Sequence, residues 1–209
     1  RKELRFFYRN ELINFVSKLN VISQVNHPAI LKFIGFSSVN FNGELKPVIV
    51  TENFGASLNL TYLRRRDSVL LTTKSCLIYG IAAGMAFLHS HGIIHRDLKI
   101  SNIYSDMFHR PKIGGFDLAI ELNNKNSIKC DQIKGTPAYL APEVYKYKEY
   151  SRKSDVYSFG LLVYEILTAR HAFGSETNPK KLKEIVMNDK IHLNFDENPI
   201  NATYRELIE

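Results

Sequence analysis

The sequence has few cysteines, no tryptophan and no apolar run long enough to cross a bilayer. Its 2 cysteines, Cys76 and Cys130, cannot form a disulfide framework, and they lack the CxxC spacing of a zinc site. The longest apolar stretches, 77–88 and 159–167, are shorter than the roughly 20 residues that a spanning helix needs. The sequence therefore predicts a protein of the reducing cytoplasm, with no membrane span in this chain.

The composition is that of a globular protein with a basic excess. Among 209 residues, 44% are hydrophobic, and 28 Lys and Arg against 21 Asp and Glu give a formal net charge of +7. This length fits one domain, or two lobes that share a cleft. A basic protein can bind nucleic acid, but clusters such as Arg64–Arg66 are short and lack interleaved aromatic residues. We expect solvated basic faces and no specific nucleic-acid partner.

Periodicity divides the chain into a small mixed part and a larger helical part. Apolar residues between 11 and 25 have helical spacing, and His27-Pro28 ends that helix. Two β-like runs, 29–36 and 47–51, follow, with a turn signal at Asn42-Gly43 between them. Helices are then predicted at 58–63, 73–89, 155–168 and 179–188. A loop-rich segment, 114–142, remains, and a loop of that length in a compact domain is usually functional.

The segment HRDLKISN, residues 95–102, resembles the catalytic loop of protein kinases, with every fixed position of HRDxKxxN filled. The resemblance implies that Asp97 orients the substrate hydroxyl, Lys99 contacts the transferred phosphate and Asn102 holds a magnesium ion. It assigns structural roles to His95 and Arg96. A lysine two residues after the aspartate is typical of serine/threonine specificity. The alternative interpretation is that the segment only ties a loop together.

Two further segments resemble kinase motifs in the family order. Residues 135–143, GTPAYLAPE, are similar to the end of an activation segment that contains Thr136 and Glu143. Residues 155–160, DVYSFG, are similar to a helix start whose Asp155 accepts hydrogen bonds from the catalytic-loop backbone. Thr136 is a candidate phosphorylation site near Arg96, or it only hydrogen-bonds within its loop. Ser127 is a second candidate phosphorylation site.

The resemblance also implies an adenine site. Thr51, Glu52 and Phe54 follow an apolar strand and correspond to the gatekeeper and hinge, so their backbone is expected to face adenine. Tyr104 stands where the family places a small aliphatic side chain under the base. Phe116 is expected to pack in an apolar column with His95. A ring at position 104 would either narrow the pocket or stack beside the base, and the apolar column can also be simple core.

One departure concerns the magnesium ligand. In KIGGFDLA, residues 112–119, Gly115 stands where the family's DFG aspartate belongs, and Asp117 lies two positions later. Loss of the carboxylate is expected to cripple transfer unless Asp117 takes its place. Because residues two apart in extended backbone point the same way, that replacement is geometrically conceivable.

Other departures concern the ATP-binding lysine and its partner. Lys18 falls where a helix glutamate normally pairs with that lysine, and Glu11 lies two turns away, about 11 Å along a helix. Lys2 has a compatible spacing for the lysine itself. No glycine precedes Gly35, so the glycine-rich phosphate loop is absent from this chain. We expect a kinase domain truncated at both ends.

Together the motifs predict an α+β, two-lobed protein-kinase-like fold. Residues 1–54 would form a partial N-lobe and residues 55–209 a mainly helical C-lobe. HPAILKFIGFS, residues 27–37, and LAPEVY, residues 140–145, resemble the tyrosine-kinase-like group. The implied activity is transfer of the ATP γ-phosphate to a protein serine or threonine, with ATP and Mg²⁺ as cofactors. The alternative is a pseudokinase that acts as a binding or allosteric scaffold.

Overall fold

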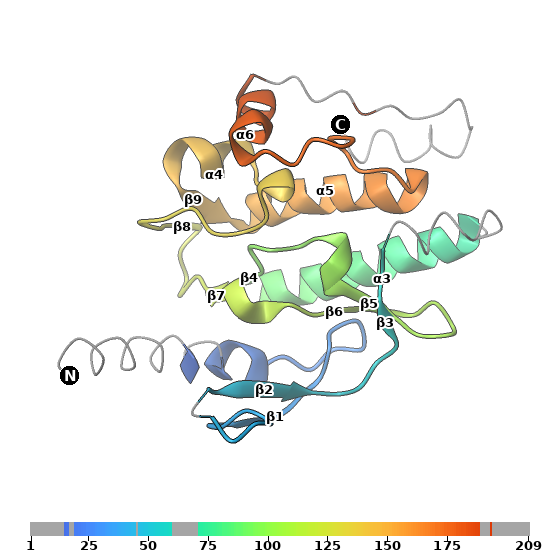
Figure 1. The fold of residues 1–209 in the computed structure, drawn as a ribbon, viewed down its shortest axis with the longest axis vertical. Helices are drawn as coiled ribbons and strands as arrows, with labels where there is room; N and C mark the ends of the chain where they lie inside the picture. The colour runs from blue at the N-terminus through green and yellow to red at the C-terminus, as the bar shows by residue number, and fades with distance from the viewer. Residues whose placement is uncertain (1–14, 17–18, 45, 60–70, 189–192, 194–209) are drawn as a thin grey trace.

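The computed structural model describes residues 15–16, 19–44, 46–59, 71–188 and 193. Residues 15–16 and 19–23 are helical, and the rest of the first predicted helix lies largely outside the described residues. The strands β1 (Phe33–Ser37) and β2 (Val48–Thr51) form an antiparallel hairpin at one end of the molecule (Figure 1). In the connection, Gly43 has a φ of 75°, the left-handed conformation that the Asn-Gly pair predicted.

Paired short strands bring two loops together. β3 (Ala56–Ser57), β5 (Ile103–Ser105) and β6 (Pro111–Ile113) form an antiparallel sheet in the order β3-β5-β6. β4 (Ile93–Ile94) pairs with β7 (Ile120–Glu121). Residues 95–102 run from β4 to β5, and residues 114–119 run from β6 to β7. Because both ends of these two loops start from paired strands, the loops lie beside each other.

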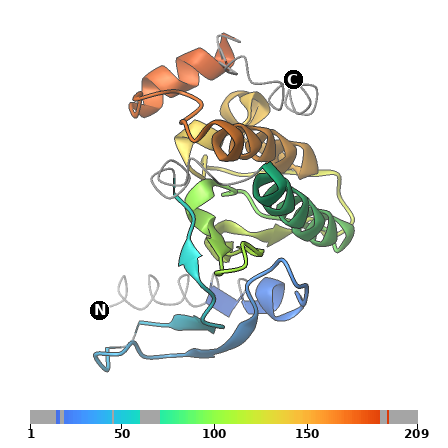
Figure 2. The ribbon, with the colours of Figure 1, turned by 90° about the vertical axis from the view of Figure 1, so that its right-hand side faces the viewer.

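Two helices form the centre of the larger part. α3 (Leu71–Ser90) and α5 (Arg152–Thr168) lie side by side in both views (Figures 1 and 2). The buried residues of α3 follow helical spacing and include Leu77, Ile81 and Leu88. By length and composition α3 could cross a membrane, a test that core helices also pass, and here α3 packs against α5 and β6. No other helix of the described residues passes that test.

The remaining elements cover the other side of α5. The 3₁₀ turn η3 (Pro137–Tyr139) and α4 (Pro142–Tyr147) follow each other, and β8 (Ser127–Lys129) pairs with β9 (Glu149–Ser151). α6 (Pro179–Met187) is capped by Asn178, whose side chain accepts hydrogen bonds from the Lys180 and Lys181 amides. Two short 3₁₀ turns lie in the paired loops, η1 (Ile100–Asn102) and η2 (Phe116–Leu118).

Of the four helices predicted after the two β-like runs, three are observed. α3, α5 and α6 lie within three residues of the predicted bounds at both ends. α5 begins earlier than predicted because Ser151 and Ser154 form a capping box before its apolar positions start. Residues 58–59 are not helical, and the rest of the predicted helix 58–63 lies outside the described part of the chain. The division after Phe54 stays a prediction.

Candidate active site

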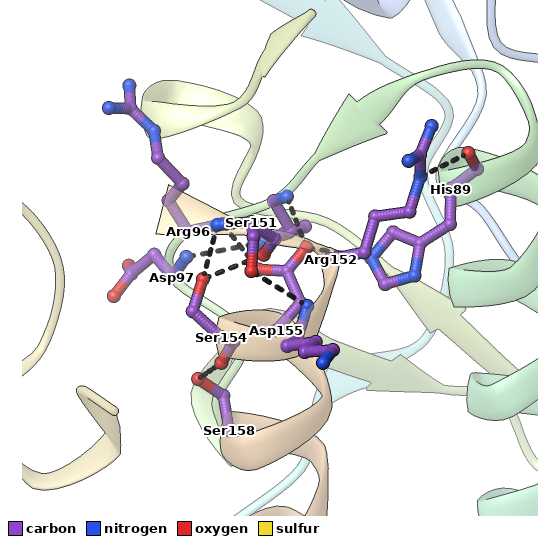
Figure 3. A network of polar contacts seen from close by, with 10 residues as sticks. His89, Arg96, Asp97, Ser151, Arg152, Ser154, Asp155 and Ser158 are labelled. Atoms are coloured by element: carbon purple, nitrogen blue, oxygen red, sulfur yellow. Dashed lines mark hydrogen bonds and ion pairs between the residues drawn. The ribbon is translucent and has the colours of Figure 1, made fainter. Parts of the chain in front are cut away.

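The buried carboxylate of Asp155 fixes the loop 95–102. Asp155, in the first turn of α5, is 1% exposed and accepts hydrogen bonds from the backbone amides of His95 at 2.8 Å and Arg96 at 2.9 Å. His89 Nε2 lies 2.9 Å from the same carboxylate (Figure 3). Arg96 has a φ of 64°, which is costly for a residue other than glycine. The two hydrogen bonds from the backbone amides to Asp155 hold this conformation in place.

His95 connects this loop to the neighbouring one. The side chain is fully buried, and its Nδ1 accepts a hydrogen bond of 3.2 Å from the Asp97 amide. The proton must therefore be on Nε2, which donates to the Gly114 carbonyl at 2.9 Å. Burial lowers the pKa of His95, so this neutral tautomer persists near neutral pH. Its ring also packs against Phe116 at a centroid distance of 5.1 Å.

A carboxylate, an ammonium group, an amide and a hydroxyl meet at Asp97. The Thr136 hydroxyl donates to Asp97 Oδ1 at 2.6 Å and accepts from Lys99 Nζ at 2.7 Å. Lys99 Nζ also lies 3.1 Å from Asp97 Oδ2. Asn102 Nδ2 donates to the Asp97 carbonyl at 2.8 Å and to Oδ2 at 3.1 Å. The side chains of Asp97 and Lys99 are 15% and 25% exposed, so the cluster is in partial contact with solvent.

The side chain of Arg96 points away from Asp155 (Figure 3). Its Nε donates to the Leu118 carbonyl at 2.6 Å and Nη1 to Cys130 Sγ at 3.3 Å, and the guanidinium lies over the Tyr150 ring. The hydroxyl of Thr136 is instead engaged by Asp97 and Lys99. Thr136 is thus hydrogen-bonded to the loop 95–102, and its role as a phosphorylation site stays a prediction.

The other two predicted residues lie on either side of Thr136 in the sequence, Ser127 before it and Glu143 after it. Ser127, in β8, donates a hydrogen bond to the Glu149 carboxylate of β9. Glu143 lies half-buried in the first turn of α4.

Glu52, Phe54 and Tyr104, three of the predicted adenine-side residues, lie beside Lys112, a residue that the sequence did not point to. Lys112 Nζ lies 2.6 Å from Glu52 Oε1 and 4.8 Å from the centre of the Phe54 ring. In the strand ladder Lys112 is opposite Tyr104. Partial burial would raise the pKa of Glu52, but its hydrogen bonds from Lys112 and the Lys32 amide outweigh burial and lower it. Thr51 ends β2, one residue before Glu52.

Two adjacent glycines leave room for two site residues. A Cβ on Gly114 would lie 2.8 Å from the Tyr104 ring. A Cβ on Gly115 would lie 2.4–2.6 Å from the Asn102 side chain, and Gly115 has a φ of 75°. The close approach of Tyr104 and Asn102 to this backbone therefore depends on both glycines lacking a side chain.

The backbone between Gly115 and Asp117 is not extended, which was the condition for Asp117 to replace a carboxylate at position 115. Residues 116–118 form the 3₁₀ turn η2, in which residues two apart do not point the same way. Asp117 is exposed on that turn. The geometric reason for expecting Asp117 to take the place of a carboxylate at 115 is therefore absent from this structure.

Comparison with known proteins settles the family. A family model described as "Protein kinase domain" matches residues 6–209. The chain belongs to the protein kinase domain family. It is 34% identical over 168 residues to Cold-responsive protein kinase 1 of Arabidopsis thaliana, a match covering 78% of this chain and 43% of the relative.

Two further relatives extend the range of similarity. Dual specificity protein kinase shkC of Dictyostelium discoideum is 35% identical, covering 82% of this chain and 34% of that protein. Serine/threonine-protein kinase PLK4 of Xenopus laevis is 31% identical, covering 83% of this chain and 18% of that protein. The kinase domain described here thus spans less than half the length of these relatives.

Protein kinases generally use ATP and Mg²⁺, so the donor atoms around Asp97 can be compared with a magnesium site. The Nδ2 of Asn102 donates to Asp97, which leaves its Oδ1 as one oxygen ligand. Position 115 contributes no carboxylate. Among the described residues, no group of three or more His, Cys, Asp or Glu could hold a metal ion. The expected set of magnesium ligands is therefore incomplete in this part of the chain. Lys2, Glu11 and Lys18, which the sequence analysis considered for the ATP-binding lysine and its partner, lie outside the described residues.

Proposed function

We propose that this kinase domain transfers the γ-phosphate of ATP to a serine or threonine of a protein substrate. One observation carries the proposal, the convergence of Asp97, Lys99, Asn102 and Thr136 within hydrogen-bonding distance. Phosphoryl transfer needs an acceptor for the attacking hydroxyl and a cation beside the phosphate, held in position before the reaction. This cluster offers both, and the names of the relatives support the same class of reaction.

The roles follow from the contacts. Asp97 Oδ1 accepts a hydrogen bond from the Thr136 hydroxyl, so it is able to accept one from a substrate hydroxyl in the same region. Lys99 Nζ, next to that carboxylate, would contact the transferred phosphate. Asn102 would orient Asp97 and offer its Oδ1 to a metal. His95, Arg96 and Asp155 position the loop.

ATP would place its adenine beside Thr51, Glu52, Phe54 and Tyr104. The grouping of Glu52, Phe54 and Tyr104 around Lys112 supports this arrangement. We also propose that phosphorylation of Thr136 or Ser127 controls the activity. The proposed location of the protein is the cytoplasm. A pseudokinase scaffold is the second candidate, favoured by one observation, Gly115 in place of the magnesium carboxylate.

The test is transfer of labelled phosphate from ATP to a general protein substrate by the 209-residue chain. Asp97→Asn should reduce transfer at least a hundredfold, in the range of a lost general-base contribution. Asp131→Asn, a change of the same type at an exposed position, should leave transfer unchanged. Transfer that is equal in both variants would reject Asp97 as the base. ATP binding without any transfer would favour the scaffold.

A further inference from the structure

The charged side chains of α3 point into the protein. All residues of this helix are described, and Lys74 is its only Lys, Arg, Asp or Glu. Lys74 Nζ donates to the Leu167 carbonyl of α5 at 2.6 Å, and His89 lies 2.9 Å from the buried carboxylate of Asp155. A helix face that meets water normally carries charged residues. The outward face of α3 therefore differs from an ordinary solvent-facing helix.

The outward positions of α3 form one continuous stripe. The exposed residues are Thr72, Cys76, Tyr79, Ala86 and Ser90, and the partly exposed Ala83 lies between them. Because these positions are three or four residues apart, they share one side of the helix. The stripe runs along all 20 residues of α3, a length of about 30 Å. Tyr79 is its one large side chain and is 78% exposed.

The turn between β5 and β6 extends this surface. A Cβ on Gly80 would lie 2.4 Å from a ring carbon of Pro111, so the start of β6 packs directly beside the stripe. In the turn that precedes Pro111, Met107 and Phe108 are 82% and 70% exposed. Exposed apolar side chains that gather in one place mark an interaction surface more often than single ones do.

Internal hydrogen bonds fix the conformation of this turn. The Asp106 carboxylate accepts hydrogen bonds from the amides of Phe108 and Arg110, each at 3.0 Å. It also pairs with the Arg110 guanidinium, which lies over the Phe108 ring. The carboxylate and the guanidinium of the turn therefore neutralise each other. Met107 and Phe108 are held outward without adding a net charge to the surface.

Electrostatics favour a second copy of this chain as the partner. The chain has a formal net charge of +7, so two copies repel each other when their basic faces approach. At the stripe of α3 the two copies can meet without placing like charges opposite each other. A strip about 30 Å long and about 10 Å wide covers roughly 300 Å² per copy, below the roughly 800 Å² of a standard interface. The surface therefore suits a weak dimer.

We propose that two copies of the chain form a weak two-fold dimer through antiparallel α3 helices. In a two-fold interface, a residue that contacts a second residue of the other copy is contacted in return. Full overlap of the two helices puts the axis beside Ile81. Tyr79 then faces Ala83 of the other copy, and Cys76 faces Ala86. A large side chain thus meets a small one at the centre of the interface.

The first experiment measures association of the 209-residue chain by sedimentation velocity from about 1 to 200 μM, the range expected for a small interface. The weight-average sedimentation coefficient should rise with concentration and level off at the value of a dimer. A monomer at every concentration overturns the proposal, and so does growth beyond a dimer. A chain that stays monomeric but binds phosphatidylcholine vesicles overturns the choice of a second copy as the partner.

Substitutions at the centre of the stripe test the face and the register. Tyr79→Ala should weaken association about tenfold, the usual effect of losing a central aromatic side chain. Combining Tyr79→Ala with Ala83→Tyr exchanges the large and the small residue and should recover most of that loss. Tyr147→Ala is the control, because Tyr147 is also exposed and ends α4, on the other side of α5 from α3 (Figures 1 and 2). Equal association of Tyr79→Ala and Tyr147→Ala overturns the face, and a combined variant as weak as Tyr79→Ala overturns the register.

A crosslinking experiment tests the same register without relying on changes of affinity. Positions 76 and 86 of one helix are about 15 Å apart along its axis, so a short bismaleimide cannot join them within one copy. In Ala86→Cys the reagent should link Cys76 to the new thiol of a second copy and give a product of twice the chain's mass. Val156→Cys, at an exposed position of α5, should give no such link. Absence of the 76–86 link in Ala86→Cys, or an equal yield from Val156→Cys, overturns the antiparallel arrangement.

Discussion

Asp155→Asn should destabilise the protein by about 2–4 kcal/mol. The native carboxylate accepts hydrogen bonds from the amides of His95 and Arg96 and from His89. An asparagine oxygen can serve one backbone amide, and His89 can change its tautomer to accept from the new NH₂ group. One buried N–H is still left facing another donor, which costs roughly 1–3 kcal/mol. The remaining hydrogen bonds become weaker because their acceptor is no longer charged.

The magnitude matters because the total stability of a domain is only about 5–15 kcal/mol. The assay is urea unfolding of both proteins at pH 7.5, monitored by circular dichroism. Asp131→Asn, at an exposed position, should remain within about 0.5 kcal/mol of the native protein. If Asp155→Asn also stays within that margin, the buried carboxylate is not what holds the catalytic loop, and the reasoning about Arg96 fails.

Three further outcomes are expected. Burial lowers the pKa of His95, so the free energy of unfolding should fall as the pH drops below about 6.5. Urea unfolding between pH 5 and 7 should show a weaker dependence of this free energy on pH in His95→Asn. Gly114→Ala should lower the free energy of unfolding by about 1–3 kcal/mol, and adding Tyr104→Ala should recover part of that loss in a double-mutant cycle. Additive effects of the two substitutions would contradict the close approach of the Tyr104 ring to Gly114. Thr136→Val should lower stability by about 1–3 kcal/mol through its two lost hydrogen bonds, as thermal unfolding would detect.

The sequence predicted the parts of the fold that depend on local pattern. The periodic apolar positions of α3 and α5 located both helices, and the motif at 95–102 located the cluster around Asp97. These features are encoded by neighbouring residues. The family match confirms the kinase assignment that the motifs implied.

The sequence could not predict contacts between distant residues. Lys112 and Glu52 are 60 positions apart, and only the folded chain pairs them. Gly115 has a left-handed conformation beside Asn102 and a 3₁₀ turn follows it, so the extended backbone that would have let Asp117 replace a carboxylate at position 115 is not found. A short polar segment has several accessible conformations, and tertiary contacts select one of them.

The most direct test of the whole account is phosphate transfer by the native chain and by Asp97→Asn, each with Mg²⁺ and with EDTA. With Mg²⁺ we expect slow transfer by the native protein, because position 115 supplies no carboxylate, and at least a hundredfold less transfer by Asp97→Asn. Both proteins should show the same thermal shift on adding ATP. Transfer that survives in Asp97→Asn would contradict the central claim that the carboxylate beside Lys99 and Thr136 orients the attacking hydroxyl.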